Sequence, residues 1–253
     1  MFESAKVIKD NHFFIFLPNK EILAPVKVNL DIKLTDLKEI ENQKDIVLKN
    51  TMNFVNNSPS TNIFLWGAKG MGKSTLIKCI VEHVNNKLSK DLKLVEVLNN
   101  NIEKIVEVVY GLSMSDNKFL IYIDDISFNN NDKDLKLFKS LVEGSLLSHS
   151  ENIRYYITSN LRHLSHNSTS NDLNNLQEKE LSQNLISLSD RFGYWLGFYD
   201  SNQEKYLNMV KHYLKKNSIK YTPEHENMAL KWSLEKGNFS GRTASQFIKT
   251  LFK

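Results

Sequence analysis

The chain has 253 residues, of which 41% are hydrophobic, and a formal net charge of +4. This length suffices for one large domain, or for a core and a small lid, and the mild charge permits nucleic-acid contact without requiring it. The single cysteine, Cys79, excludes an internal disulfide framework and a cysteine metal site. No apolar run approaches the roughly 18 residues of a membrane span and no signal-peptide pattern is present, so we expect a cytoplasmic protein without a membrane contact.

Apolar runs of strand length alternate with helical patterns along most of the chain. The strand-like runs cover residues 13–17, 62–66, 94–97, 118–123, 153–158 and 195–199. The helical patterns cover residues 40–54, the stretch after Lys73, residues 102–110 and residues 132–147. Strands that alternate with helices predict an α/β fold in which a parallel sheet is covered on both faces.

The end of the chain follows a different pattern. After Asp200 only helices are predicted, over about residues 202–216, 223–235 and 240–251. We therefore expect three parts, which are an N-terminal extension at residues 1–36, a core at residues 37–200 and a small helical lid at residues 201–253. Residues 166–184, which are rich in Asn, Ser and Gln, are interpreted as a surface loop.

Residues 67–74, with the sequence GAKGMGKS, fit the P-loop pattern and lie between a predicted strand and a predicted helix, as that motif requires. The glycines let backbone N–H groups wrap phosphates, Lys73 neutralises the outer phosphates and Ser74 binds magnesium. The expected ligands are therefore ATP and Mg²⁺. The nucleotide-binding residues predicted for this loop are Gly67, Ala68, Lys69, Gly70, Met71, Gly72, Lys73, Ser74 and Thr75.

The apolar strand at residues 119–123 ends in Asp124 and Asp125, which is the Walker B pattern. Asp124 is expected to hold the magnesium ion together with Ser74, and Asp125 to orient or deprotonate the attacking water. The alternative is a pair of Asp residues that only caps the end of a strand. The P-loop in the same chain favours the catalytic interpretation.

Only four of the 33 basic residues are arginines: Arg154, Arg162, Arg191 and Arg242. Lys, Asn and Ile are abundant, a composition typical of an A/T-rich genome, in which Arg should persist best where its planar, bidentate fork is needed. Chance survival is the alternative at each position. On the first interpretation, Arg162 is a candidate for a subunit interface and Arg154 for a buried or paired structural role.

Three later motifs make the chain resemble the AAA+ ATPases. TSN at residues 158–160 is similar to sensor 1, SDRFG at residues 189–193 to the arginine-finger segment, and SGR at residues 240–242 to sensor 2 of the lid. The segments LWGAKGMGKSTL, IDDISF, ITSNLRHL and LSDRFGYWLGFY resemble most closely an uncharacterised bacterial AAA+ family, domain of unknown function 815. Replication initiators and helicase loaders are more distantly similar.

This resemblance, which covers residues 37–251, implies a three-layer AAA+ core with a five-stranded parallel sheet and a helical lid. It implies catalytic roles for Asn160 and Arg191 beside Asp125, and a nucleotide contact for Arg242. Arg191 would act in trans on the ATP of a neighbouring subunit, which implies a homo-oligomer. Most AAA+ members carry Glu where this chain has Asp125, so fast turnover is not expected.

The activity implied by the resemblance is that of an ATPase, slow without its oligomer or partner, that couples nucleotide state to the remodelling or loading of a protein or nucleic acid. The alternative is a nucleotide-gated, DNA-associated loader or switch with little turnover. A small-molecule P-loop kinase is disfavoured, because it would not need the finger, sensor 2 and separate lid. The basic stretch from Lys211 to Tyr221 is compatible with nucleic-acid contact, although a solvated helix face is the preferred interpretation.

Overall fold

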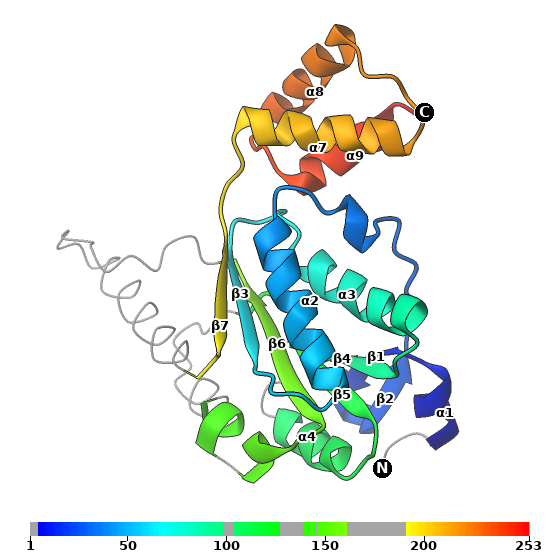
Figure 1. Cartoon of the computed structure of the whole chain (residues 1–253), viewed down its shortest axis with the longest axis vertical. Helices are drawn as coiled ribbons and strands as arrows, with labels where there is room; N and C mark the ends of the chain where they lie inside the picture. Colours follow the sequence, from blue (N-terminus) through cyan, green and yellow to red (C-terminus); the bar gives the residue numbers. More distant parts are fainter. Residues whose placement is uncertain (1–4, 99–103, 127–138, 145, 161–190, 253) are drawn as a thin grey trace, which may run out of the picture.

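The computed structural model describes residues 5–98, 104–126, 139–144, 146–160 and 191–252 (Figure 1). Within them, one seven-stranded sheet forms the centre of the molecule. Its strands are β1 (Phe13–Leu17), β2 (Ile22–Pro25), β3 (Ile63–Gly67), β4 (Leu92–Glu96), β5 (Lys118–Ile123), β6 (Ile153–Ser159) and β7 (Tyr194–Phe198).

The strands are hydrogen-bonded in the order β2-β1-β4-β5-β6-β3-β7. β1 and β2 form an antiparallel hairpin, and every other neighbouring pair is parallel. The predicted α/β class is thus confirmed, but the predicted count of five strands is too low. The five expected strands are present as β4-β5-β6-β3-β7, and the hairpin at residues 13–25, which was assigned to the N-terminal extension, adds two strands beside β4.

The hairpin joins the sheet for a simple physical reason. Alternate side chains of β1, Phe14 and Phe16, are 2% exposed and belong to the same apolar cluster as the central strands. The backbone of β1 pairs with that of β4, whose edge would otherwise present unpaired N–H and C=O groups. Because this structure does not define domain limits, the boundaries at residues 36 and 200 stay predictions.

Helices cover both faces of the sheet, which gives the three layers expected from the sequence. Side chains of α2 (Glu41–Val55) and α3 (Lys73–Leu88) pack on one face, and those of α4 (Ile105–Ser113) and α1 (Ala5–Asp10) on the other. β5 shows how the layers divide, because successive strand residues point to opposite faces. Its odd-numbered residues 119, 121 and 123 face the α4 layer, and residues 120 and 122 face the α2 and α3 layer.

Three helices after β7 form a separate unit above the carboxyl end of the sheet (Figure 1). They are α7 (Gln203–Lys216), α8 (Pro223–Lys236) and α9 (Gly241–Thr250). The side chains of Asn202, Thr222 and Ser240 cap their amino ends, and a cluster of their own apolar residues forms their core. This unit occupies the place of the predicted helical lid, and we call it the lid.

Shorter segments complete the described residues. They are η1 (Pro18–Lys20), η2 (Leu34–Asp36), the π-helical turn η4 (Ser140–Gly144) and η5 (Leu146–His149). The last two lie where a regular helix was predicted over residues 132–147, whose first part falls outside the described residues, as does the predicted surface loop at residues 166–184. Among the helices described, none is both long and apolar enough to cross a bilayer.

Candidate nucleotide-binding site

The loop between β3 and α3 is held in place by the neighbouring strand β7. Gly67 has a φ of +115°, and a Cβ on it would lie 2.1 Å from the carbonyl oxygen of Phe198, so only glycine fits there. The next residue, Ala68, donates its backbone N–H to the same oxygen at 2.7 Å. Gly72, with a φ of +92°, then forms the N-cap from which α3 begins at Lys73.

The last helix of the lid, α9, begins against this loop. Gly70 has a φ of +82°, and a Cβ on it would lie 2.8 Å from the Oγ of Ser240, the N-cap residue of α9. The backbone N–H of Arg242 donates to the carbonyl oxygen of Gly70 at 3.1 Å. The amino end of α9 therefore packs against the loop, and any movement of the loop acts on the lid through these contacts.

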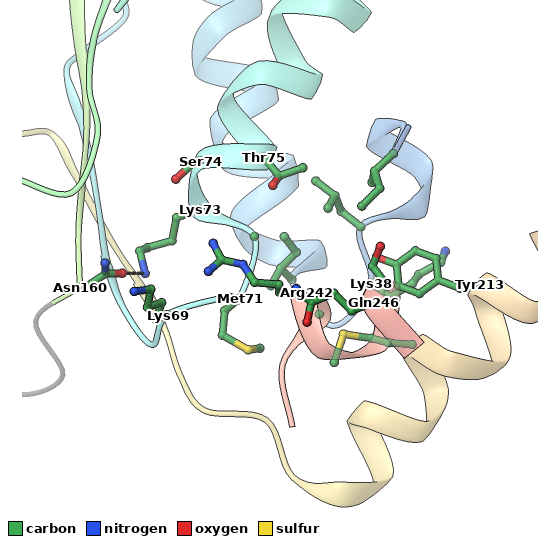
Figure 2. A pocket seen from close by; sticks show the side chains of 18 of the residues that line it. Lys38, Lys69, Met71, Lys73, Ser74, Thr75, Asn160, Tyr213, Arg242 and Gln246 are labelled. Atoms are coloured by element: carbon green, nitrogen blue, oxygen red, sulfur yellow. Dashed lines mark hydrogen bonds between the residues drawn. The ribbon is translucent and has the colours of Figure 1, made fainter. Parts of the chain in front are cut away.

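Lys73 is the cation at the centre of the site, and its side chain is 5% exposed. Its Nζ donates to the carbonyl oxygens of Gly67 at 2.7 Å and Ala68 at 2.8 Å, and to Oδ1 of Asn160 at 3.0 Å (Figure 2). Asn160 follows β6, so the structure brings the predicted sensor residue against the predicted phosphate-binding lysine.

Burial lowers the pKa of the Lys73 ammonium from 10.5 to about 8. The carboxylates of Asp125 and Asp124 oppose this shift, and the positive charge of Arg242 adds to it. A buried ammonium with a lowered pKa favours an anion close by, because the anion stabilises the charged form. The site is thus suited to a phosphate.

Asp124 and Ser74 place oxygen atoms side by side next to the loop. Ser74 Oγ donates to Oδ1 of Asp124 at 2.7 Å, and Thr158 Oγ1 donates to the same atom at 2.5 Å. Burial alone would raise the pKa of the Asp124 carboxyl, but the hydrogen bonds from Thr158 and Ser74 hold it below its usual value. An ionised carboxylate beside a hydroxyl oxygen fits the ligand preference of Mg²⁺.

Thr158 also fixes the second acid of the pair. The backbone N–H of Asp125 donates to Thr158 Oγ1 at 2.8 Å, while that hydroxyl donates to Asp124. Asp125 has a φ of +52°, a left-handed conformation that Asp adopts more readily than most residues. Sequence reasoning missed this role, although Thr158 stands in the TSN motif from which Asn160 was chosen.

These residues line one pocket of about 370 Å³ between the loop and the lid (Figure 2). Its walls include Lys69, Gly70, Met71, Gly72, Lys73, Ser74, Thr75, Asp124, Asp125, Asn160 and Arg242. Figure 2 shows the side chain of Arg242 entering from α9 toward the loop. All the predicted site residues therefore meet here except Gly67 and Ala68, which anchor the loop, and Arg191.

The other end of the pocket was not predicted. Ile32, Leu37 and Ile40 line it from residues 31–40, a segment before α2 that we call the strap, and Met209 and Tyr213 line it from α7. These residues add apolar surface to a pocket whose loop side is charged, and Lys38 and Lys249 line it as well. Apolar and cationic groups in one pocket match a nucleotide with its base and its phosphates. The strap has no recognisable sequence motif, so the sequence did not indicate that it lines the pocket.

Arg191 lies before the amino end of β7, whereas the phosphate-binding loop follows the carboxyl end of the neighbouring strand β3. It precedes β7 by three residues, and β7 runs parallel to β3, with Tyr194 opposite Ile63 and Phe198 opposite Gly67. The length of β7 alone separates Tyr194 from Phe198, the residue opposite Gly67, by roughly 13 Å. The half-buried Arg191 donates from Nη1 to the carbonyl oxygen of Lys139 at 3.1 Å, so it does not reach the pocket of its own chain.

The structure describes Arg154 but not Arg162. Arg154 donates from Nε to Ser60 Oγ at 3.1 Å and from Nη1 to two backbone carbonyl oxygens, and its guanidinium lies 5.1 Å from the ring centroid of Phe54. Arg154 is predicted to be buried or paired; it is half-buried, its partners are neutral oxygen atoms and a ring, and these contacts agree with a structural role. Arg162 and the first two residues of the SDRFG motif lie outside the described residues, so their predicted roles stay predictions.

Comparisons with known proteins give the family and the fold. A family model described as "Protein of unknown function (DUF815)" matches residues 9–253. No curated protein sequence matches the chain. Domain III of the replication initiation protein DnaA from Thermotoga maritima has a similar structure, with 15% identity, a TM-score of 0.56 and coverage of 90% of this chain and 90% of that chain.

Two larger solved structures share the fold. The RuvB Holliday junction branch migration motor of Thermotoga maritima has 16% identity and a TM-score of 0.50, with coverage of 82% of this chain and 59% of that chain. The Orc1 protein of Aeropyrum pernix, solved in complex with DNA, has 13% identity and a TM-score of 0.54, with coverage of 84% and 61%. The chain thus spans about three fifths of each. Such low identities show a common fold alone, whereas the family model covers nearly the whole chain: the protein belongs to the DUF815 family, and its fold is that of the AAA+ ATPases.

Proposed function

We propose that this protein is an AAA+ ATPase that binds ATP with Mg²⁺, hydrolyses it slowly and couples its nucleotide state to the remodelling or loading of a macromolecular partner. One observation carries the proposal. The pocket is walled on one side by Lys73, Asp124 and Asp125 and on the other by Arg242 of the lid, whose helix starts on the loop itself. A nucleotide in this pocket would contact the core and the lid at the same time.

The residue roles follow from the positions of the side chains. Lys73 and Arg242 bind phosphate oxygens, and Ser74 and Asp124 hold Mg²⁺. When bound, the ion neutralises charge that develops on the phosphates. Asp125 orients the attacking water or accepts its proton, and the amide of Asn160, which contacts Lys73, senses the outer phosphate.

Slow turnover is expected from the second acid. The Asp125 side chain is one carbon shorter than Glu, which moves the carboxylate by roughly 1 Å, and a misplacement of that size can lower a rate about 10²-fold. We further propose a homo-oligomer in which Arg191 contacts the ATP of the neighbouring subunit. Its place before the amino end of β7, away from the pocket of its own chain, supports this.

The second candidate is a nucleotide-gated, DNA-associated loader or switch with little turnover. The structural neighbours favour it, because they include a replication initiation protein, a branch migration motor and a protein solved in complex with DNA. Stimulation of the ATPase by single-stranded DNA would support the loader, and its absence would favour a protein partner. Either activity draws on cellular ATP, so we place the protein in the cytoplasm.

The test is a pair of single substitutions. Lys73→Ala should abolish ATP binding, because the loop loses its central cation. Asp125→Asn should bind ATP as the parent does and lose hydrolysis, because the amide cannot take a proton. Calorimetry and phosphate release measure the two steps, and Lys49→Ala, an exposed lysine on the outer face of α2, is the control. Hydrolysis at the parent rate by Asp125→Asn would contradict the proposed role of Asp125.

A further inference from the structure

Positive charge is unevenly distributed along the chain. Residues 203–253 contain ten Lys and Arg against four Asp and Glu, a net charge of +6, whereas residues 1–202 contain 23 against 25, a net charge of −2. The lid is thus the basic part of a molecule that is otherwise slightly acidic. A concentration of one charge sign on one part of a protein attracts ligands of the opposite sign.

Some cations of the lid already have partners toward the core. Lys216 Nζ lies 2.6 Å from Asp36, Lys249 Nζ lies 2.9 Å from Asp31, and Arg242 lines the nucleotide pocket. Three other lysines of the lid, at positions 211, 215 and 220, are exposed. None of the ion pairs found among the described residues includes any of them.

These three lysines surround one open hollow of about 520 Å³. We call it the lid groove, and its lining residues are Lys211, Lys215, Ser218, Ile219, Lys220 and Tyr221. Lys211 and Lys215 are four residues apart on α7 and so lie on the same face of the helix. Lys220 comes from the connection to α8, which lies at the end of α7 remote from β7 (Figure 1). No acidic side chain lines the groove.

The groove is also partly preorganised. Lys211 Nζ lies 4.9 Å from the centroid of the Tyr221 ring, and the hydroxyl of Tyr221 donates to the carboxylate of Glu226. The aromatic ring therefore positions the ammonium, while the nearby carboxylate is engaged by the hydroxyl. Favourable interaction with the helix dipole accounts for Lys215, which is in the last turn of α7, but not for Lys211 or Lys220.

We infer that the lid groove binds the phosphodiester backbone of a nucleic acid. Three lysines act on phosphates as point charges without sequence preference. Ile219 is the one aliphatic residue of the lining and Tyr221 the one aromatic residue, so the groove lacks a cluster of large apolar side chains to anchor a protein partner. Binding at this groove does not require the proposed ATPase activity.

One helix connects this groove with the nucleotide pocket. α7 presents Met209 and Tyr213 to the pocket and Lys211 and Lys215 to the groove. The position of the groove lysines is therefore fixed to the same rigid element that closes over the nucleotide. Any dependence of nucleic-acid affinity on ATP rests on the proposed function, whereas the binding itself does not.

The experiment measures binding of labelled oligonucleotides by fluorescence anisotropy, with no nucleotide present. Single-stranded DNA, duplex DNA and single-stranded RNA of matched length serve as separate probes, so that the source of the phosphodiester is identified. The triple variant Lys211→Glu/Lys215→Glu/Lys220→Glu should bind roughly 10²-fold more weakly near 50 mM salt, and its slope of log affinity against log salt should fall by about 2 for a single strand.

A matched control has the same change of net charge at another place. Lys20→Glu/Lys49→Glu/Lys87→Glu alters three exposed lysines that lie on separate elements and line neither the groove nor the pocket. It should bind nearly as the parent does. Equal losses in both triple variants would overturn the inference, as would parent-like binding by the groove variant, or tighter binding of polyglutamate than of any oligonucleotide. Unchanged thermal unfolding of the groove variant shows that it is folded, and loss of ATP binding in Lys73→Ala would leave this readout intact.

Discussion

At the scale of single residues, the buried ammonium of Lys73 links the site to pH. Its pKa, lowered by burial to about 8, should rise again when a phosphate approaches, because the anion stabilises the charged form. Well below pH 8 the group is charged before and after binding, so almost no proton is exchanged. Above that pH the free site has lost the proton and must take one up.

We therefore predict that ATP binding takes up close to one proton at about pH 9 and only about a quarter of one near pH 7.5, and that the affinity falls toward tenfold for each pH unit above about 8. Calorimetry in two buffers of different ionisation enthalpy measures the uptake, with saturating Mg²⁺ to keep the protonation of ATP constant. The binding at pH 7.5 serves as the control. Equal proton uptake at both pH values would show that Lys73 keeps its ordinary pKa.

Thr158 gives a second prediction at this scale. Its hydroxyl donates to Asp124 and accepts from the backbone of Asp125, so Thr158→Val removes both contacts at once while keeping the shape of the side chain. We expect hydrolysis to fall between about 10-fold and 10²-fold, because both acids lose their positioning contact. Phosphate release measures this, and Thr158→Ser, which retains the hydroxyl, should stay near the parent rate. A valine variant as active as the serine variant would show that Thr158 is only structural.

At the scale of elements, the strap and the lid are joined by a compact polar contact. Asp36 of the strap is 6% exposed and lies 2.6 Å from Lys216 Nζ and 3.3 Å from His212 Nε2, both on α7. Burial by itself would raise the pKa of Asp36, but hydrogen bonds from Lys216, the backbone of Lys33 and His212 hold it below its ordinary value. The strap and α7, which both line the nucleotide pocket, are thus tied together.

We predict that Asp36→Asn destabilises the protein by about 2 kcal/mol, toward the low end for a buried pair because Lys216 and His212 are partly exposed. For a chain of this size the melting temperature should fall by about 4–8 °C. Because folding lowers this pKa, the stabilisation is fully present above the unfolded value of about 4 and is lost as the pH falls through the folded value. The parent and the variant should therefore converge in acid.

Thermal unfolding at neutral and acid pH measures this effect. The control is Asp31→Asn, which breaks the pair with Lys249, in which both side chains are more than half exposed. An exposed pair contributes little, so this variant should unfold like the parent. If both variants lose the same stability, or if the Asp36 variant stays less stable below the acid transition, the proposed contribution of the buried pair is wrong.

The same elements show what the sequence could and could not predict. The P-loop and Asp124 were predictable, because a motif of fixed spacing between a strand and a helix dictates its own geometry. The placement of Asn160 and Arg242 in the pocket followed from motif resemblance. The strap was not predictable, because Leu37 and Ile40 are ordinary apolar residues whose position depends on tertiary packing against α3. The hairpin was predicted in part: the apolar run at residues 13–17 indicates a strand, but the sequence does not show which strands it pairs with.

At the scale of the whole molecule, Arg191 decides whether the site is complete in one chain. Because the length of β7 separates it from its own pocket, Arg191→Ala should leave ATP affinity unchanged and lower turnover about 10³-fold or more if it serves a neighbour's ATP. Mixing it with Lys73→Ala subunits should restore part of the activity, because some interfaces then combine an intact loop with an intact finger. Parent-like turnover in the variant, or no recovery on mixing, would exclude action between subunits.

The seating of α9 on the P-loop also has a mechanical consequence. The lid rests at its near end on Gly70, through the backbone of Arg242, and has a separate apolar core that lets it move as one body. α7 has 14 residues and is therefore about 21 Å long. It acts as a lever arm: a tilt of about 10° at the loop would displace its far end by about 4 Å, provided that the contact of Lys216 with Asp36 opens or the strap moves with α7. Small displacements around Lys73 would thus become larger, measurable displacements at the end of α7 where Lys215 lies.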